Sequence, residues 1–171
     1  MSRSGWGERR PATDAEAKAL ASGVRLRILR LCLDRPLTNR EIAVRLERNP
    51  ASVLHHVRTL VDTGFLVAEP ARRGARGARE VPYRATGRSW QLDLSDQPAP
   101  ARDPILAAFL GEVAAVGESR LRSSRLGLRL DPAHEQEFTD ELYGLLDRWA
   151  TRAPDEGGQR WSVYLGMHPE D

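Results

Sequence analysis

Residues 37–84 read LTNREIAVRLERNPASVLHHVRTLVDTGFLVAEPARRGARGAREVPYR, and the first half of this stretch contains the start and stop signals of two helices. The segment TNRE at 38–41 fits the capping box, in which a threonine N-cap and a glutamate three residues later satisfy free amides of the first turn. Asn49 and Pro50 start a second helix, because asparagine caps well and proline is tolerated at the first helical position. Gly64 is typical of the residue that follows a helix. The sequence therefore predicts a helix-turn-helix.

The second predicted helix, which runs from Pro50 to about Thr63, has an apolar face and a polar face. Val53, Val57 and Leu60 recur at helical spacing, which predicts the side that faces the core. The opposite side, at roughly 100° per residue, is polar. Residues near the N-terminus of a recognition helix usually reach base edges in DNA. The expected base contacts are Asn49, Ser52 and His55.

The second half of the stretch predicts a β-hairpin with a cationic tip. Residues 65–68 (FLVA) and 81–85 (VPYRA) read as short strands, and Pro70, Gly74 and Gly77 break the loop between them. The arginines of this loop suit phosphate contact or insertion into a minor groove, whose negative potential attracts them. A hairpin in this place is the wing of a winged helix.

Together these elements predict one DNA-binding surface. The helix-turn-helix would present polar side chains to the major groove, and the wing would present guanidinium groups to the backbone or the flanking groove. The predicted DNA contacts are Thr38, Asn39, Arg40, Asn49, Ser52, His55, Arg58, Thr59, Arg72, Arg73, Arg76 and Arg79.

Three segments resemble the ArsR-type winged-helix repressors in their order and spacing. They are ALASGVRLRIL at 19–29, LTNREIA at 37–43 and SVLHHVRTLVDTGFL at 52–66. The resemblance covers roughly residues 14–90 and implies a winged-helix fold, a dimer and action on operator DNA. Metal-sensing members of that family carry paired cysteines on the first helix of the helix-turn-helix, whereas EIAVRL at 41–46 has none. Metal sensing is therefore not carried over, and no metal or cofactor is expected.

Composition and charge agree with a nucleic-acid partner. With 171 residues, 40% hydrophobic and 29% charged, the chain is globular and forms one domain or two small ones. Residues 1–90 contain 18 Lys+Arg against 9 Asp+Glu, and residues 91–171 contain 8 against 15, so the net charges are +9 and −7. Such a division predicts that the N-terminal half faces DNA.

The single cysteine and the lack of long apolar runs bear on location. Cys32 lies in an apolar helical run and is expected in the core. One cysteine allows no disulfide within the chain, which fits a reducing cytoplasm. No apolar run approaches the length of a membrane span, so we expect a cytoplasmic protein with no membrane partner.

Four parts are predicted along the chain. Residues 1–13 are expected to be a flexible N-terminal arm, and residues 14–94 the winged helix-turn-helix domain. Residues 95–104 are a linker that is stiffened by prolines. Residues 105–171 are expected to serve dimerisation, because about 70 residues are few for an independent core. The fold class is therefore mainly α with a small β component (α+β).

The C-terminal part reads as helix, strand, helix and strand. The apolar spacing predicts helices from Ile105 to about Arg122 and over 132–151, whereas alternating apolar residues predict strands over 126–131 and 161–166. Aromatic residues of this part could line a pocket for a small apolar effector, although they are more often core or interface. These aromatic residues are Trp149, Trp161 and Tyr164.

The sequence offers no constellation for catalysis. It contains no phosphate-binding glycine loop, zinc pattern or nucleophile elbow. His55 and His56 are adjacent, so their rings diverge on a helix and do not easily share a metal. We therefore expect no enzyme.

The sequence thus predicts a homodimeric, sequence-specific transcriptional regulator, a repressor by resemblance, on a palindromic operator with half-sites about one helical turn apart. One alternative adds a small-molecule effector bound by the C-terminal half. A second alternative is a winged helix that docks a protein and has no operator. The sequence names neither the operator nor the effector.

Overall fold

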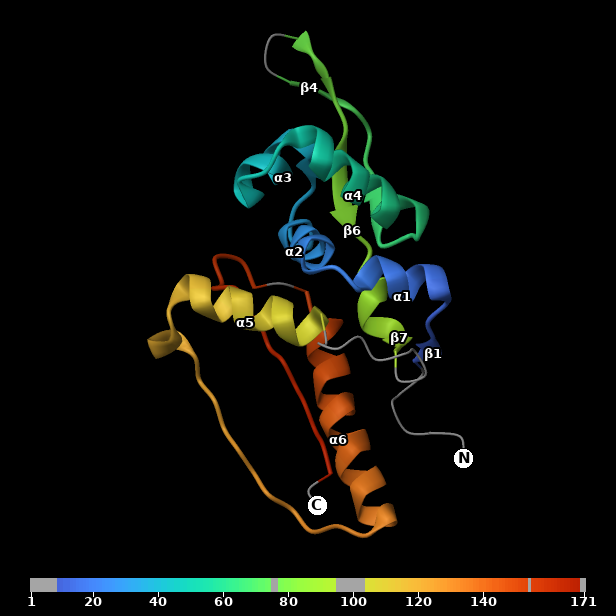
Figure 1. Ribbon diagram of the computed structural model, residues 1–171, viewed down its shortest axis with the longest axis vertical. Helices are drawn as coiled ribbons and strands as arrows, with labels where there is room; N and C mark the ends of the chain where they lie inside the picture. Colours follow the sequence, from blue (N-terminus) through green and yellow to red (C-terminus); the bar gives the residue numbers. More distant parts are fainter. Residues whose placement is uncertain (1–8, 75–76, 95–103, 154, 170–171) are drawn as a thin grey trace.

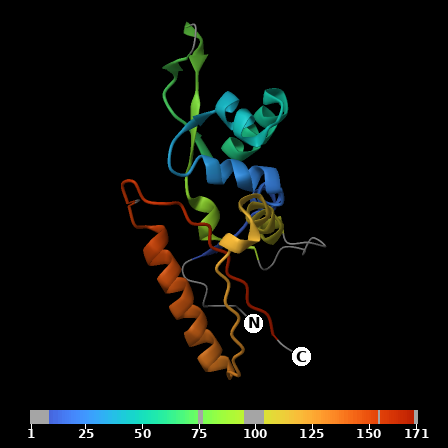
Figure 2. The same ribbon diagram turned by 90° about the vertical axis from the view of Figure 1, so that its left-hand side faces the viewer.

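The computed structural model describes residues 9–74, 77–94, 104–153 and 155–169 (Figure 1). In that view α1 to α4 and the strands labelled β4 and β6 form the upper part of the molecule, with α5 and α6 below them, and β1 and β7 lie at the level of α5 and α6. Figure 2 shows the same order of the helices from the side. This is the expected α+β class. The elements in chain order are β1 (Arg10–Pro11), α1 (Asp14–Leu20), α2 (Gly23–Leu31), β2 (Leu37–Thr38), α3 (Asn39–Leu46), α4 (Pro50–Asp62), β3 (Leu66–Ala68), β4 (Arg72–Arg73), β5 (Arg79–Glu80), β6 (Pro82–Ala85), the 3-10 helix η2 (Arg88–Gln91), β7 (Leu92–Asp93), α5 (Pro104–Val116), the 3-10 helix η3 (Glu118–Arg120) and α6 (Pro132–Ala150).

The predicted helix-turn-helix is formed by α3 and α4, and its helix ends lie where the capping signals predict them. The Thr38 hydroxyl accepts a hydrogen bond from the amide of Glu41, and the Glu41 carboxylate accepts one from the amide of Thr38. Asn49 caps α4 by accepting from the amide of Ala51 at 2.8 Å. Gly64 lies two residues after α4 with φ +73°, a left-handed conformation that costs glycine little.

One apolar core joins α1 to α4 and the strands beside them. The predicted inner face of α4 is confirmed, since Val53, Val57 and Leu60 are at most 1% exposed. Cys32 also lies in the core as predicted, and burial raises the pKa of its thiol to about 11. The largest fully buried side chains are Phe65, Ile28, Ile42, Leu60, Leu66, Val53, Val57 and Cys32. Burying such groups contributes roughly 1.5–3 kcal/mol each before entropy is counted, so this core fixes the angle between α3 and α4.

The wing is an antiparallel hairpin that extends from a three-stranded sheet. The strand order in that sheet is β2-β6-β3, with Leu37 opposite Tyr83 and Leu66 opposite Ala85. The prediction of a plain loop over 69–79 is corrected here, because β4 and β5 pair with each other within it. The amide of Gly74 donates to the carbonyl of Ala78 at 2.8 Å and continues the hairpin toward its tip.

Residues 9–13 are not a loose arm, contrary to the prediction for residues 1–13; residues 1–8 of that arm lie outside the described part of the chain. β1 pairs in parallel with β7, and the amide of Ala12 donates to the carbonyl of Asp93. The buried Glu16 carboxylate accepts hydrogen bonds from both terminal nitrogens of Arg10. The guanidinium of Arg9 lies 4.1 Å from the ring centre of Trp90 and 4.4 Å from that of Tyr143 in α6. These contacts are far apart in sequence, which is why local patterns do not predict them.

The C-terminal part agrees with the predicted helices but not with the predicted strands. α6 lies where it was expected, and α5 ends at Val116 rather than near Arg122, followed by Gly117 with φ +90°. Residues 121–131 and 159–169 are extended chain without a paired strand among the described residues. A strand needs a partner for its backbone groups, and the described residues supply none there.

The linker was predicted over residues 95–104, but Pro104 is the first residue of α5. The other residues of the predicted linker, 95–103, lie outside the described part of the chain. α5 packs against α2 and thereby joins the C-terminal part to the core of the winged helix. Within the described residues, no helix combines the length and the apolar character needed to cross a lipid bilayer.

Candidate nucleic-acid interface

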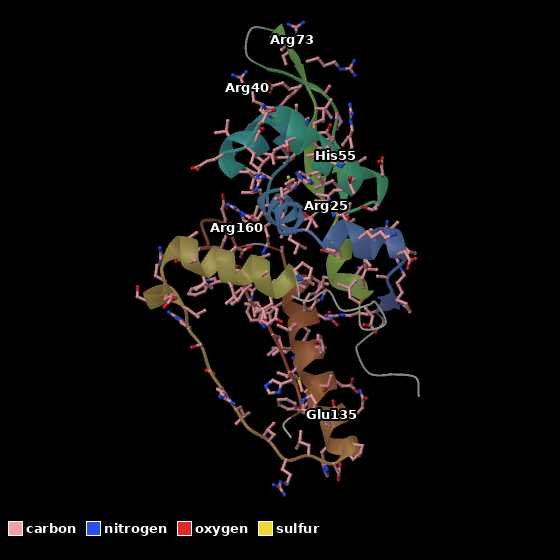
Figure 3. All side chains as sticks on the ribbon, in the orientation of Figure 1. Arg25, Arg40, His55, Arg73, Glu135 and Arg160 are labelled. Atoms are coloured by element: carbon pink, nitrogen blue, oxygen red, sulfur yellow. The ribbon has the colours of Figure 1, made fainter. Side chains whose placement is uncertain are left out.

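The helix-turn-helix and the wing lie together at one end of the molecule. Figure 3 shows Arg40 of α3, His55 of α4 and Arg73 of the wing in the upper part of the view, whereas Glu135 of the acidic α6 lies at the opposite end. The structure thus separates the basic surface from the acidic half of the chain. A polyanion approaching the upper end would meet the positive potential first.

The outer face of α4 is polar and open. Ser52, His55 and Arg58 are exposed, and none of their side chains makes a hydrogen bond or ion pair with another described residue. Their positions are fixed because Val53 and Val57, which alternate with them around the helix, are anchored in the core. An outer face held by a rigid inner face is what readout in a major groove requires.

Two residues predicted to contact DNA at the start of α3 have internal roles instead. Thr38 is 4% exposed and its hydroxyl caps α3, so its side chain is not presented to a ligand. The amide nitrogen of Asn39 donates to the carbonyl of Pro50 at 2.9 Å and ties the start of α3 to the start of α4. Both side chains therefore set the geometry of the helix pair. Arg40, the next residue, is exposed and has no partner among the described residues.

Two further predicted contacts are engaged within α4. The side-chain oxygen of Asn49 caps the helix, which leaves its amide nitrogen as the group that points away from the backbone. The hydroxyl of Thr59 donates to the carbonyl of His55 at 3.1 Å, one turn earlier in the same helix. Asn49 is exposed and Thr59 is half-buried.

The wing brings two arginines face to face. In the β4–β5 pair Arg73 lies directly opposite Arg79, while Arg72 lies opposite Glu80. Like charges directly opposite each other destabilise a pair of strands. Arg73 and Arg79 are exposed, and neither has an acidic partner among the described residues. A phosphate group between them would offset this repulsion. Arg76 lies outside the described residues.

Arg72 has a different environment, which local sequence patterns do not reveal. Its guanidinium lies 3.0 Å from a carboxylate oxygen of Glu41, the residue that also completes the cap of α3. The hydrogen bond from the Thr38 amide lowers the pKa of Glu41, and Arg72 lowers it further, so this carboxylate stays ionised at neutral pH. Glu41 thus holds the wing against α3. The capping box is visible in the sequence, but a contact between positions 41 and 72 is not.

The structure therefore divides the twelve predicted contacts into three groups. Five residues have internal partners, namely Thr38, Asn39, Asn49, Thr59 and Arg72. One, Arg76, is not described. Six residues of the predicted set are exposed, and their side chains have no hydrogen-bonding or charged partner in the described chain: Arg40, Ser52, His55, Arg58, Arg73 and Arg79.

His56, the neighbour of His55, points partly inward. The two rings lie 5.8 Å apart between centres and are tilted by 59°, so they diverge as expected for adjacent residues on a helix. Burial lowers the pKa of His56, and the positive charge of Arg25 adds to that effect. Within the described residues, no group of three or more His, Cys, Asp or Glu is placed to hold a metal ion.

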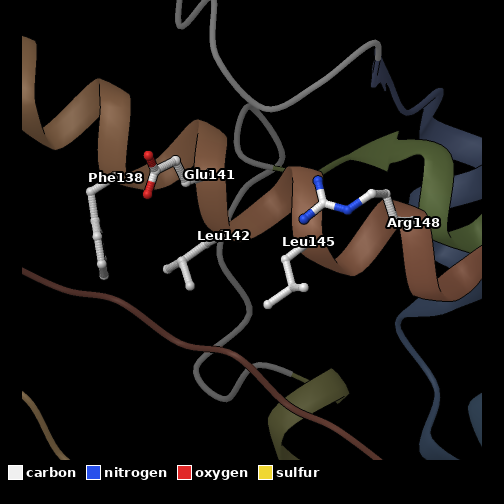
Figure 4. A pocket seen from close by; sticks show the side chains of 5 residues that line it. All are labelled: Phe138, Glu141, Leu142, Leu145 and Arg148. Atoms are coloured by element: carbon white, nitrogen blue, oxygen red, sulfur yellow. The ribbon is translucent and has the colours of Figure 1, made fainter.

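A cavity of about 430 Å³ lies along α6, far from the helix-turn-helix (Figure 4). Phe138, Leu142 and Leu145 project from one face of the helix, and Glu141 and Arg148 flank them. All five lining residues belong to α6. The cavity is therefore an uncovered apolar helix face rather than a pocket enclosed by several elements.

Comparison with known proteins finds one family match. Residues 22–67 match the family described as bacterial regulatory protein, arsR family. These residues span α2, the helix-turn-helix and the start of β3. No curated protein matches the chain.

Several solved structures are similar to the chain. Reduced HlyU from Vibrio cholerae N16961 is 27% identical over 45% of this chain and 75% of that chain, with a TM-score of 0.36. The homodimeric winged helix-turn-helix domain of Mb0332 from Mycobacterium bovis, described as a possible ArsR-family transcriptional regulator, is 23% identical over 65% and 82%, with a TM-score of 0.37. Bacillus subtilis PadR in complex with operator DNA is 13% identical over 74% and 95%, with a TM-score of 0.35.

All three TM-scores lie below 0.5, so the similarity to the arsR family rests on the match at residues 22–67, which is less than half of the chain. Capped α3, recognition helix α4 and the hairpin wing follow one another as a winged helix requires. Residues 22–67, which form the helix-turn-helix and its neighbours, are therefore similar to the bacterial regulatory proteins of the arsR family.

Proposed function

We propose that the protein is a homodimeric repressor that binds a palindromic operator, with α4 of each copy in a major groove. The observation that carries this proposal is the open face of α4, where the exposed side chains of Ser52, His55 and Arg58 make no hydrogen bond or ion pair with the described residues, next to a wing whose Arg73 and Arg79 have no acidic partner there. Ser52 and His55 lie near the N-terminal end of α4 and would read base edges. Arg58 and the wing would bind phosphates and place the protein on the duplex.

Dimerisation through the C-terminal part is supported by the distribution of exposed apolar residues. Four large hydrophobic residues are exposed before residue 95, whereas thirteen are exposed after residue 103. They include Leu145 and Trp149 on α6 and alternate residues of the two unpaired extended segments. Monomeric proteins rarely expose apolar surface on this scale. A second copy would cover the α6 face of Figure 4 and offer the extended segments a partner strand. The division into residues 14–94 and 105–171 is part of this proposal.

A repressor of this kind would respond to any event that changes the spacing of its two recognition helices. Two-fold symmetry sets half-sites about one helical turn, roughly 34–36 Å, apart. The proposal of a repressor rather than an activator rests on the family that residues 22–67 match.

The first test is selection of bound sequences from a random duplex DNA pool by the full chain. We expect an enriched palindrome. The variants Ser52→Ala and His55→Ala should change which sequence is enriched, because they alter base contacts. Arg79→Ala should instead weaken binding to all sequences. Arg120→Gln, at an exposed arginine outside this surface and outside the extended segments, serves as the control.

Three results would count against the proposal. No enrichment by a folded dimer favours a winged helix that docks a protein. Unchanged binding by all three variants would mean that the DNA-binding face lies elsewhere. Finally, Trp149→Arg should convert the dimer to a monomer, because it places a charge on the exposed face of α6. The mass is measured by light scattering after size exclusion. An unchanged dimer would mean that the interface lies on another surface.

A further inference from the structure

A second cavity lies where the winged helix meets the C-terminal part, away from the proposed DNA-binding face. Its volume is about 300 Å³, the lower end of the range for small-molecule sites. Its walls come from α2, the last turn of α3, α5 and the C-terminal segment. Figure 3 shows Arg160 of that segment beside α2 and α5.

Arginine is the dominant charged residue of this cavity. The arginines that line it are Arg27, Arg30, Arg45 and Arg160, whereas the lining contains a single carboxylate, that of Glu112. Two of the four arginines are already paired. Arg30 lies 3.5 Å from Glu112, and Arg160 lies 2.7 Å from Asp34.

The other two arginines have no carboxylate partner among the described residues. Arg45 donates to the backbone carbonyl of Glu41 at 3.1 Å, and Arg27 makes no hydrogen bond or ion pair. The cavity therefore keeps about two positive charges that nothing in the described chain neutralises. Guanidinium groups bind carboxylates through paired, charge-assisted hydrogen bonds, so an anion is the ligand that this charge favours.

Of the four remaining lining residues, Ser162 is polar and the other three are apolar or aromatic. Leu31 and Leu46 contribute aliphatic surface, and Trp161 contributes an exposed indole ring. Inorganic phosphate would leave this apolar surface in contact with water. A small organic carboxylate with an aromatic or aliphatic body would use both the charge and the apolar wall.

The C-terminal wall of the cavity is held by hydrogen bonds to α5 and to α2 of the winged helix. Ser162 donates to Glu112 in α5 at 2.8 Å, and Arg160 donates to the backbone carbonyl of Arg30 at 2.5 Å. The opposite wall contains Arg45 and Leu46, which end the first helix of the helix-turn-helix. A bound molecule would therefore contact both the DNA-binding unit and the C-terminal part.

We propose that this cavity is an effector site for a small organic carboxylate with an apolar body, bound by Arg27 and Arg45 against Trp161. The site is separate from the α6 face, and it is not the purely apolar pocket that the aromatic residues of the sequence suggest. Its regulatory consequence rests on the proposed function: the ligand would fix the C-terminal part against α3 and so change the spacing of the recognition helices. Binding itself does not depend on that function.

Binding is tested by isothermal titration of the full chain, without DNA, with benzoate and octanoate as probes and benzamide as the neutral counterpart of benzoate. We expect saturable binding of at least one carboxylate and none of benzamide. Arg27→Gln combined with Arg45→Gln should weaken binding by about tenfold or more, because two charged hydrogen-bond donors are lost. Arg129→Gln, an exposed arginine outside the cavity, should leave binding unchanged.

Four results would overturn the site: no binding of either carboxylate, equal binding of benzamide, equal loss in Arg129→Gln, or full displacement by inorganic phosphate. Circular dichroism of each variant separates loss of the site from loss of the fold.

Regulation is tested separately, by titrating selected operator DNA with and without the bound carboxylate. A change in operator affinity of about fivefold or more, typical of allosteric coupling, supports the regulatory role, and an unchanged affinity overturns it. If the protein selects no DNA at all, the proposed function fails, and the calorimetry alone decides the carboxylate site.

Discussion

Substitution of Arg73 by glutamine tests the wing as a phosphate-binding element. Arg73 lies opposite Arg79 in the hairpin, and neither has an acidic partner in the described chain. The substitution removes one positive charge and the repulsion with it, so the free protein should not lose stability. Binding to DNA, in contrast, should lose one phosphate contact in each copy.

The magnitude follows from the unpaired arginines of the surface. Arg40, Arg58, Arg73 and Arg79 are exposed without acidic partners among the described residues. If each neutralises one phosphate, a dimer makes about eight contacts, and log K should fall with log salt at a slope of about −7. Arg73→Gln removes two contacts per dimer, so the slope should become shallower by about 1.8.

The assay is fluorescence anisotropy with the selected operator at several salt concentrations. Arg73→Lys, which keeps the charge, should keep the wild-type slope, and Arg120→Gln controls for a general loss of charge. A slope that is unchanged in Arg73→Gln would refute the assignment of the wing to phosphate. So would an equal change of slope in Arg120→Gln, which would indicate a diffuse electrostatic effect.

Three further predictions concern the support of this surface. Glu41→Gln removes the ionic contact with the half-exposed Arg72, so the free energy of unfolding should be lower by about 0.5 kcal/mol and hydrogen exchange in the wing should be faster. Unchanged exchange would contradict the role of Glu41 in holding the wing against α3. The hydrogen bond from Arg10 lowers the pKa of Glu16 to about 2, against an ordinary 4.5. The stability that ionised Glu16 contributes is therefore present above pH 4.5 and is lost as the pH falls toward 2. In urea titrations at pH 7, Glu16→Gln should lower the free energy of unfolding by about 2 kcal/mol, a value reduced because Arg10 is partly exposed. An equal loss at pH 2 would contradict the ionic origin of this stability. Because the pKa of His56 is lowered in the folded protein, the unfolded chain binds a proton at this histidine at a higher pH than the folded chain does. The free energy of unfolding should therefore fall as the pH drops below 6.5, and it should fall less in His56→Gln, as measured by urea midpoints.

The features that the sequence predicts correctly are those fixed by neighbours along the chain. The cap at Thr38, the start of α4 at Pro50 and the glycine after it depend on backbone groups within four residues, and all three are confirmed. The apolar face of α4 is likewise a matter of local spacing. Helix ends and helix faces of this kind can be read without knowledge of the rest of the molecule.

The features that the sequence does not predict depend on contacts between distant segments. The pairing of β1 with β7 and the contact of Glu41 with Arg72 join positions that no periodicity links. The role of Asn39 is missed for the same reason, since its partner is the carbonyl of Pro50 in the next helix. Alternation over 126–131 predicted a strand, but alternation shows only that a segment could pair, not that the same chain offers a partner.

The buried position of Cys32 makes the native protein suitable for distance spectroscopy. Thiol reagents react with exposed thiolates. Cys32 is fully buried, and its thiol has a pKa raised to about 11. Since the chain has no other cysteine, the native protein should not take up a spin label at neutral pH. Asp62→Cys, at the exposed end of α4, would then accept the label at one position per copy. In a two-fold dimer the pair of labels would report the separation of the recognition helices directly, with and without operator or carboxylate.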